Sequence, residues 1–357
     1  MKLQKCGGDV LELSERKKAI LVALIKSYIY TGEPIGSKAL CSILDFNVSS
    51  ATLRNEMSEL CEMGLLEQPH TSAGRIPTNH AYRLYIDTLM DKKVITDSMK
   101  QAIDSLLGEA ARDPEHLTSV AGQILADLTG LPTLLATVAN NKSYVRRVEL
   151  MTMGRRTVLI VLITSDGVAR SRICRTDSDL SAELIATFDR LISAKIVGAE
   201  LDKFNTVLLQ TLVVETGGFA LSLTPLITAI FEMAQDIHKS KVSLGGESNL
   251  MPCYGNENDV RRLLNLVSRQ NTLISLLQGI NRSVDVVFGD VTGIDELKPS
   301  NMVVAKYSLG SEELGRIGVI GPTRMAYEQV IPGIEYFALK LGNIMKQTMR
   351  DLEDYNG

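Results

Sequence analysis

The start of the chain combines an apolar stripe with helical spacing and clear stop signals. Apolar side chains recur every three to four residues over 20–29, and Ser14 stands where a helix N-cap is expected. Gly32 and Pro34 follow the stripe. Because glycine favours the position after a helix and proline cannot continue one, the pattern predicts a first helix that ends near residue 31.

Two further helices are predicted next, and the second of them has a polar face. Ser37 can cap a short helix, and Ser49 or Ser50 can cap another over residues 51–63. The polar side chains that lie largely off the apolar side of this helix are Ser50, Thr52, Arg54, Asn55 and Ser58. Hydroxyl, amide and guanidinium groups bind phosphates and major-groove base edges. A solvated face on a small helical bundle is the alternative interpretation.

A turn-rich segment after this helix predicts a β-wing. Gly64 ends the helix, residues 65–66 can start a strand, and residues 69–77 form a loop that returns to a second strand. The loop carries one cation, Arg75, which suits contact with a minor groove or a row of phosphates. Together these elements are typical of a winged helix-turn-helix over residues 13–90.

A fourth helix completes this unit. Thr78 or Asn79 can cap it, and Tyr82 and Tyr85 recur at helical spacing together with aliphatic side chains. Aromatic side chains can stack on unpaired bases, but a ring within an apolar helical stripe is more often part of a core. We therefore interpret both tyrosines as core residues.

The remainder of the chain predicts one α+β domain interrupted by a helical block. Helices are expected over 94–109 and 114–129, and strands near 134–139, 145–152, 158–164 and 168–174. The apolar run over 158–164 predicts a strand that is buried on both faces. Residues 179–240 lack strand patterning, and their surplus apolar positions predict a dimer contact. Strand patterns return at 284–289, 302–309 and 316–320, after a glycine-rich loop over 243–255 and a helix over 257–279, and a helix over 324–352 closes the chain.

These patterns divide the chain into a series of predicted regions. The regions are a leader over 1–12 with no assigned function, the winged helix-turn-helix over 13–90, the α+β domain over 91–178 and 243–357, and the inserted helical unit over 179–242. Strands on both sides of a helical block imply a single domain with an insertion. The predicted fold class is therefore α+β.

Composition adds little to the DNA hypothesis. The net charge is −4, and residues 1–90 hold ten basic and ten acidic side chains, so no excess of cations points to nucleic acid. The sequence has no apolar run of eighteen residues and no signal-peptide pattern, which predicts a cytoplasmic protein without membrane spans. Its five cysteines are scattered, so we expect neither disulfides nor a metal site.

The sequence offers no catalytic constellation. It contains no Gly-x-Gly-x-x-Gly, no phosphate-binding loop, no His-Glu-x-x-His and no Gly-x-Ser-x-Gly. The four histidines are far apart in the sequence. We therefore expect no enzyme and no cofactor. Gly318, Gly321, Pro322 and Arg324 are compatible either with an anion site or with a tight strand-to-helix turn, and the turn is favoured.

Specific strings in the winged region resemble one family. Residues 48–57 (VSSATLRNEM) and 69–75 (PHTSAGR) are similar to the HrcA family of heat-inducible transcription repressors. The resemblance continues through 77–78 and 81–90 (AYRLYIDTLM) and returns at 317–327 (IGVIGPTRMAY). It therefore spans nearly the whole chain.

The resemblance implies both a fold and a function. It implies a GAF-like α+β domain with a helical insert that makes a homodimer, an inverted-repeat operator upstream of chaperone operons, and the chaperonin GroEL as a partner. A metabolite-sensing regulator, with a ligand in the GAF-like domain, is the alternative function. The expected DNA-binding residues are Lys38, Ser49, Ser50, Thr52, Arg54, Asn55, Ser58, His70, Thr71, Ser72 and Arg75. Among them, Ser50, Thr52 and Asn55 are candidates for base edges.

Overall fold

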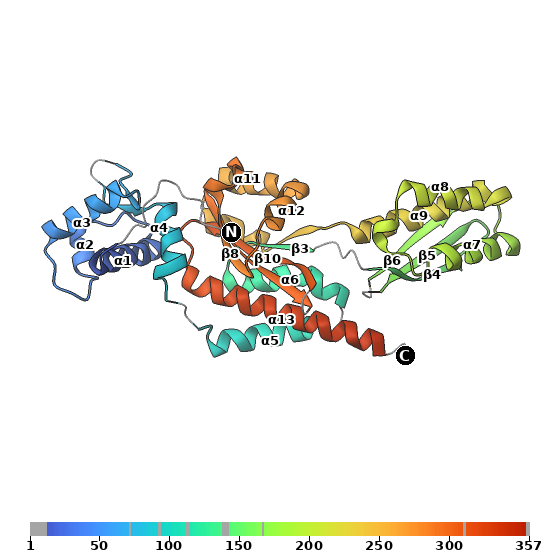
Figure 1. Ribbon diagram of the computed structural model, residues 1–357, viewed down its shortest axis with the longest axis horizontal. Helices are drawn as coiled ribbons and strands as arrows, with labels where there is room; N and C mark the ends of the chain where they lie inside the picture. The colour runs from blue at the N-terminus through green and yellow to red at the C-terminus, as the bar shows by residue number, and fades with distance from the viewer. Residues whose placement is uncertain are drawn as a thin grey trace.

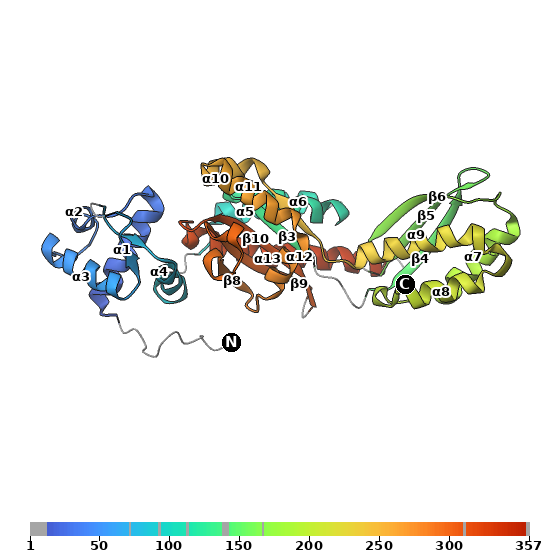
Figure 2. The ribbon, with the colours of Figure 1, turned by 90° about the horizontal axis from the view of Figure 1, so that it is seen from above.

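The molecule is elongated, with three regions in a row (Figure 1). The computed structural model describes residues 13–70, 73–91, 94–111, 114–137, 143–165, 168–309 and 312–354. The helical N-terminal region lies at one end, a domain built on a five-stranded sheet lies in the middle, and a third region lies at the other end (Figures 1 and 2). The two ends are thus connected only through the middle domain in both views.

The N-terminal region is a winged helix-turn-helix, as the sequence predicts. Its elements are α1 (Glu15–Thr31), α2 (Ser37–Cys41), α3 (Ser50–Glu62), β1 (Leu66–Glu67), β2 (Ile76–Pro77), α4 (Asn79–Leu84) and the π-helical turn η1 (Tyr85–Leu89). The side chains of Ser14, Ser49 and Thr78 accept hydrogen bonds from the first turns of α1, α3 and α4. These caps satisfy backbone N–H groups that a helix start leaves without partners.

The wing packs back on the loop before α2. β1 and β2 pair antiparallel, and Ile35 and Arg75 exchange backbone hydrogen bonds of 2.9 Å in both directions. A Cβ at Gly74 would lie 2.4 Å from the Ile35 carbonyl carbon, so only glycine fits at this crossing. The base of the wing is therefore fixed to the helical scaffold.

The middle domain is built on an antiparallel sheet in the order β7-β3-β10-β9-β8. Its strands are β3 (Thr133–Thr137), β7 (Val242–Gly245), β8 (Val284–Phe288), β9 (Ser300–Leu309) and β10 (Glu312–Pro322). Its helices are α5 (Asp97–Ala110), α6 (Pro114–Thr129), α10 (Leu250–Tyr254), α11 (Glu257–Ser268), α12 (Gln270–Gln278) and α13 (Tyr327–Asp354). An antiparallel sheet whose strands are not joined in a β-α-β alternation, together with packed helices, agrees with the α+β class.

Both faces of this sheet are covered. Side chains such as Val303, Val319 and Phe337 form one core with α5, α6 and α13, and this core continues into the winged region. Side chains such as Val304 and Ile320 form another core with α10, α11 and α12. The middle domain therefore has three layers, with the sheet between two layers of helices.

The third region, hereafter the insert (residues 143–239), is larger than the sequence predicts. It contains β4 (Val145–Thr152), β5 (Thr157–Thr164), β6 (Ala169–Arg175), α7 (Ala182–Lys195), α8 (Thr206–Glu215) and α9 (Ala220–His238). The strands form their own sheet and share a core with these helices. The predicted start at residue 179 is therefore corrected to about 143. Strand patterning shows that a strand exists, but it does not show which sheet the strand joins.

The prediction that residues 158–164 are buried on both faces is wrong. Along β5, buried positions alternate with half-buried ones, because helices cover only one face of the insert sheet. The half-buried side chains are Leu159, Val161 and Ile163. A strand with apolar residues on both faces thus leaves one apolar face without a helical cover.

Three smaller differences concern the second half of the chain. The helix expected over 257–279 is divided at Arg269 into α11 and α12. The expected loop over 243–255 contains the end of β7, the turn η4 (Glu247–Asn249) and α10. Residues 217–238 are long and apolar enough to span a membrane, but half of this segment is buried inside the insert, as in the core helix of a soluble protein.

Candidate nucleic-acid interface

The third helix of the winged region separates an apolar side from a polar one. Leu53, Met57 and Leu60 of α3 are buried in the N-terminal core. Arg54, Asn55 and Ser58, which the sequence analysis selects, are exposed. Ser58 follows Arg54 by four residues and Asn55 by three, so its side chain lies on the same face as theirs.

Ala51 lies on the same exposed face, and the sequence analysis did not select it. Its methyl group is exposed three residues before Arg54 and seven before Ser58. An alanine methyl can contact the methyl group of a thymine in the major groove. Helical spacing from Arg54 indicates that Ala51 lies on this face, but a selection of polar side chains alone leaves Ala51 out.

Ser50 and Thr52 hold the helix start rather than extend from it. The Ser50 hydroxyl is 2.9 Å from the Ser37 hydroxyl of α2, and the Ser49 hydroxyl is 2.8 Å from that of Thr52. Ser50 and Thr52 are half-buried, whereas Ser49 is exposed. The structure therefore gives Ser50 a role in holding α2 against α3 and gives Thr52 a role in the cap of α3, and it leaves the exposed face to the residues around Asn55.

Two acidic residues of α3, Glu56 and Glu59, are paired with basic residues of α1. Lys17 Nζ lies 2.7 Å from a Glu59 carboxylate oxygen and 3.2 Å from one of Glu56. The hydrogen bonds that the Lys17 ammonium donates to the Glu59 and Glu56 carboxylates raise the pKa of Lys17. Arg16 adds a longer contact to Glu56. This pairing offsets the negative charge near the helix, which lowers its repulsion of DNA phosphates.

The DNA-binding residues expected beside α3 differ in how far they are exposed. Lys38 in α2 and His70 at the wing are exposed. Arg75 is half-buried, and its Nε donates to Cys61 Sγ over 3.1 Å, so it braces the wing against α3. The sequence showed the cation but not this partner. Thr71 and Ser72 lie outside the described residues.

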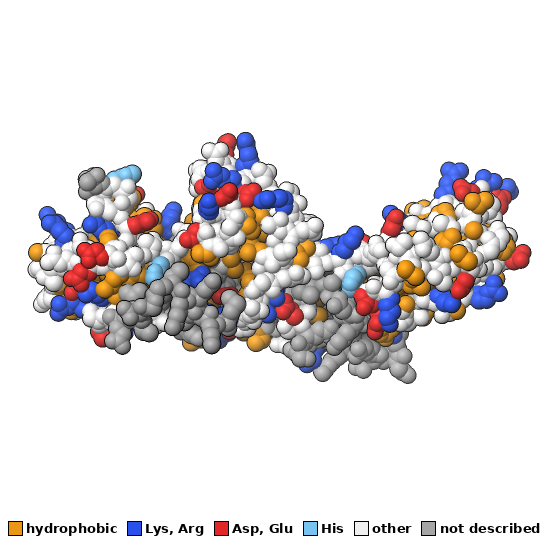
Figure 3. Space-filling view, turned by 45° about the horizontal axis from the view of Figure 1, so that its top comes forward, with side chains coloured by type: hydrophobic (Ala, Val, Ile, Leu, Met, Phe, Trp, Pro, Cys, Tyr) orange, Lys and Arg blue, Asp and Glu red, His pale blue; other side chains and the backbone are white. Residues whose placement is uncertain are grey.

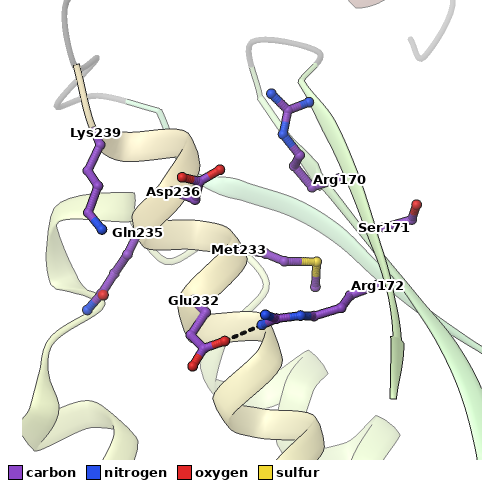
Figure 4. A pocket seen from close by; sticks show the side chains of 8 residues that line it. All are labelled: Arg170, Ser171, Arg172, Glu232, Met233, Gln235, Asp236 and Lys239. Atoms are coloured by element: carbon purple, nitrogen blue, oxygen red, sulfur yellow. Dashed lines mark hydrogen bonds and ion pairs between the residues drawn. The ribbon is translucent and has the colours of Figure 1, made fainter. Parts of the chain in front are cut away.

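A cleft in the insert has little bearing on small-molecule sensing. It has a volume of about 390 Å³ and lies between β6 and α9 (Figure 4). Arg172 pairs with Glu232 across it, and Asp236 pairs with Lys241. These charges satisfy one another, and the cleft does not lie in the middle domain. In the described part of the chain, no cluster of three His, Cys, Asp or Glu side chains could hold a metal.

The fold and this face define a class of protein. A polar helix presented by a helix-turn-helix and flanked by a wing is the architecture of DNA-binding transcription regulators. Comparison with known families agrees with this class. Residues 12–89 match the family described as "Winged helix-turn-helix transcription repressor, HrcA DNA-binding", and residues 115–331 match "HrcA protein C terminal domain".

The chain belongs to the HrcA family of transcription repressors. It is 30% identical over 339 residues to the heat-inducible transcription repressor HrcA of Clostridium botulinum, which covers 94% of this chain and 98% of that protein. It is 31% identical over 346 residues to that of Desulforudis audaxviator, covering 95% and 99%. The family is one of repressors and not of enzymes.

A solved structure shares the fold. A crystal structure of a hypothetical protein at 2.2 Å resolution aligns with a TM-score of 0.68 and 24% identity, covering 94% of this chain and 100% of that chain. The similarity therefore extends over the winged region, the middle domain and the insert.

Proposed function

We propose that this protein represses heat-shock chaperone operons by binding an inverted-repeat operator as a homodimer. The carrying observation is the exposed face of α3, with Arg54, Asn55 and Ser58 beside the wing, in a chain of a repressor family. The relatives are named heat-inducible repressors, which supports chaperone operons as the targets. Occupation of such an operator would block transcription.

In this proposal α3 enters the major groove, as the second helix of helix-turn-helix proteins does. Asn55 reads an adenine edge, and Arg54 contacts a guanine or a phosphate. Lys38 and the wing residues contact the backbone and the adjacent minor groove. The wing residues in question are His70, Thr71, Ser72 and Arg75.

The dimer contact is proposed on the helical side of the insert. Val207 and Val214 in α8 are 71% and 79% exposed, and Leu221 at the start of α9 is 82% exposed. The spacing of seven residues between Val207 and Val214 puts them on one side of α8. Figure 3 shows apolar side chains on the insert surface. Exposed apolar residues in a row favour a protein partner, here a second copy of the chain.

The proposal also includes a place of action and a chaperonin partner. A repressor of this kind acts on DNA in the cytoplasm. We include the chaperonin GroEL as the partner that maintains active repressor and is diverted by heat stress. The metabolite-sensing alternative gains no support from the cleft of Figure 4, because that cleft lies in the insert and Arg172 and Glu232 pair across it.

The proposal is tested by fluorescence anisotropy at a fixed, stated salt concentration. Purified protein is titrated with a duplex that carries the inverted repeat from upstream of a chaperone operon, and with a duplex in which each half-site is scrambled. We expect tighter binding to the intact repeat by about a thousandfold or more, and a larger active fraction when GroEL is added. Equal binding to both duplexes would refute the operator. A response to a metabolite but not to GroEL would favour the alternative.

A further inference from the structure

The winged region meets the middle domain through a buried carboxylate at the start of α13. Tyr85 Oη donates a hydrogen bond of 2.5 Å to Glu328 Oε1, and Lys26 Nζ lies 2.8 Å from the same oxygen. The Glu328 side chain is only 12% exposed. A carboxylate this well buried depends on its partners, because an unpaired buried charge is strongly destabilising. Glu328 thus connects α1 and η1 of the winged region to the middle domain.

A pair of tyrosines reinforces this contact. The rings of Tyr82 and Tyr327 lie 5.8 Å apart, and both are almost completely buried. The Tyr327 hydroxyl accepts a hydrogen bond from the Asn301 amide and donates one to the Thr323 carbonyl. The ring that α4 packs against is therefore held rigidly by β9 and by the loop before α13.

Arg324 occupies the space beside the end of α1. A Cβ at Gly32 would lie 2.7 Å from an Arg324 guanidinium nitrogen, and Gly32 has a φ of 71°. Any side chain at Gly32 would displace this arginine and strain the backbone. The strand-to-helix segment of residues 317–327, which resembles the repressor family, thus packs against the equally similar segment of residues 81–90 and against α1.

We call this interface the joint, and it consists of Lys26, Tyr82, Tyr85, Arg324, Tyr327 and Glu328. Two further contacts lie beside it. The Arg83 guanidinium lies 4.9 Å from the centre of the Phe288 ring, and Arg282 pairs with Asp87 over 3.2 Å. The contacts of the winged region come from three elements, α1, α4 and η1. A movement of this region away from the middle domain therefore has to break contacts made by several elements. Domains of one chain commonly move relative to each other unless such an interface holds them.

The joint lies between the winged region and the rest of the molecule, so it holds the recognition helix in place relative to the insert. The winged region and the insert lie at opposite ends of the molecule (Figures 1 and 2). If two copies associate through the insert, the distance and angle between their recognition helices depend on the joint of each copy. We propose that the joint is the positioning element that sets which separation of operator half-sites the dimer accepts. This inference rests on the proposed binding of an inverted repeat by a dimer.

The physical argument concerns the loss of orientation. A rigid joint holds the second recognition helix at its half-site at a high effective concentration for one separation and at a low one for others. A loosened joint spreads the helix over more positions. Affinity then falls at the preferred separation, and the discrimination between separations falls with it. Contacts within each half-site are unaffected.

The experiment uses the full-length protein with the substitutions Lys26→Met and Tyr85→Phe together. These changes remove two partners of the Glu328 oxygen but keep the apolar stem and the ring. Glu328→Gln is the second variant, and Lys18→Met, which removes an exposed ion pair with Glu15, is the matched control. Each protein is titrated with duplexes at the native half-site separation, with the separation changed by about two and about five base pairs (half a helical turn), and with one half-site alone.

We expect wild type and the control to bind the native separation best. The double variant should lose about tenfold at that separation, because its second recognition helix is held at its half-site at a lower effective concentration, and it should discriminate less between separations. Its affinity for the single half-site should be unchanged. An unchanged separation profile in both variants would overturn the role of the joint, and so would an equal loss on the single half-site. A wild type that does not prefer the inverted repeat would instead refute the proposed function itself.

Discussion

The two ends of this molecule expose opposite kinds of surface. At the winged end, α3 exposes Arg54, Asn55 and Ser58 and buries its leucines. At the insert end, α8 and α9 expose Val214 and Leu221, although the insert already has a core of its own. Polar hydrogen-bonding groups suit base edges, and exposed aliphatic groups suit a protein surface. This difference supports the proposal that DNA binds at one end and a second chain at the other.

The largest expected effect comes from charged substitutions on the exposed apolar surface of α8 and α9 in the insert. Val214→Asp with Leu221→Asp should convert the dimer to a monomer, because two carboxylates would be buried without partners. Operator affinity should fall by about a hundredfold or more, since the second half-site is then no longer bound in an intramolecular step. Light scattering gives the mass, and anisotropy gives the affinity.

A matched substitution elsewhere in the insert distinguishes its two apolar surfaces. Ile173 is 64% exposed on β6, and Ile173→Asp should leave the dimer intact. A monomer from Ile173→Asp and a dimer from the double variant would move the interface to the open face of the insert sheet.

The polar end is tested by Asn55→Ala. If Asn55 reads a base, this change should weaken operator binding by about 1–3 kcal/mol and have little effect on random DNA. Asn47→Ala, an exposed change in the turn before α3, is the control and should have no such effect. An equal loss on operator and random DNA would refute base reading by Asn55. Binding titrations on both duplexes give the comparison.

The support beneath the polar face should be measurable as stability. Ser49 accepts a hydrogen bond from the Thr52 backbone N–H at the start of α3. Ser49→Ala should lower the free energy of unfolding by about 1 kcal/mol, the usual value for a lost cap. Ser58→Ala, within the same helix, should cost much less. Urea denaturation measures both, and equal effects would contradict the capping role.

The smallest expected effect is that of Lys38. If this exposed lysine contacts a phosphate, Lys38→Ala should lower the slope of the logarithm of the binding constant against the logarithm of salt concentration by about one unit. The loss should be the same for operator and random DNA. Titrations at several salt concentrations give the slope, and an unchanged slope would remove Lys38 from the interface.

Local features of the fold could be predicted from the sequence because they depend on nearby residues. The helix over 114–129 has the bounds that its periodicity indicates, and Tyr82 and Tyr85 are core residues, as predicted. The caps at Ser14, Ser49 and Thr78 are likewise short-range interactions. Such interactions are encoded within one or two helical turns.

Distant partnerships could not be predicted in the same way. The strands over 145–175 have the expected positions but join the insert sheet, because alternation does not specify a neighbour. Tyr85 and Glu328 are separated by 243 residues, so no spacing rule connects them. At the interface, Ser50 was selected for its hydroxyl, but that hydroxyl is engaged by Ser37.

In the proposed function, two chains bind one inverted repeat through α3, so the mass of the protein–DNA complex is decisive. This mass is determined by light scattering, on duplexes that carry the complete repeat or one half-site. We expect two chains on the complete repeat, bound far more tightly than on the half-site. A single chain on the complete repeat, with the same affinity as on the half-site, would contradict it.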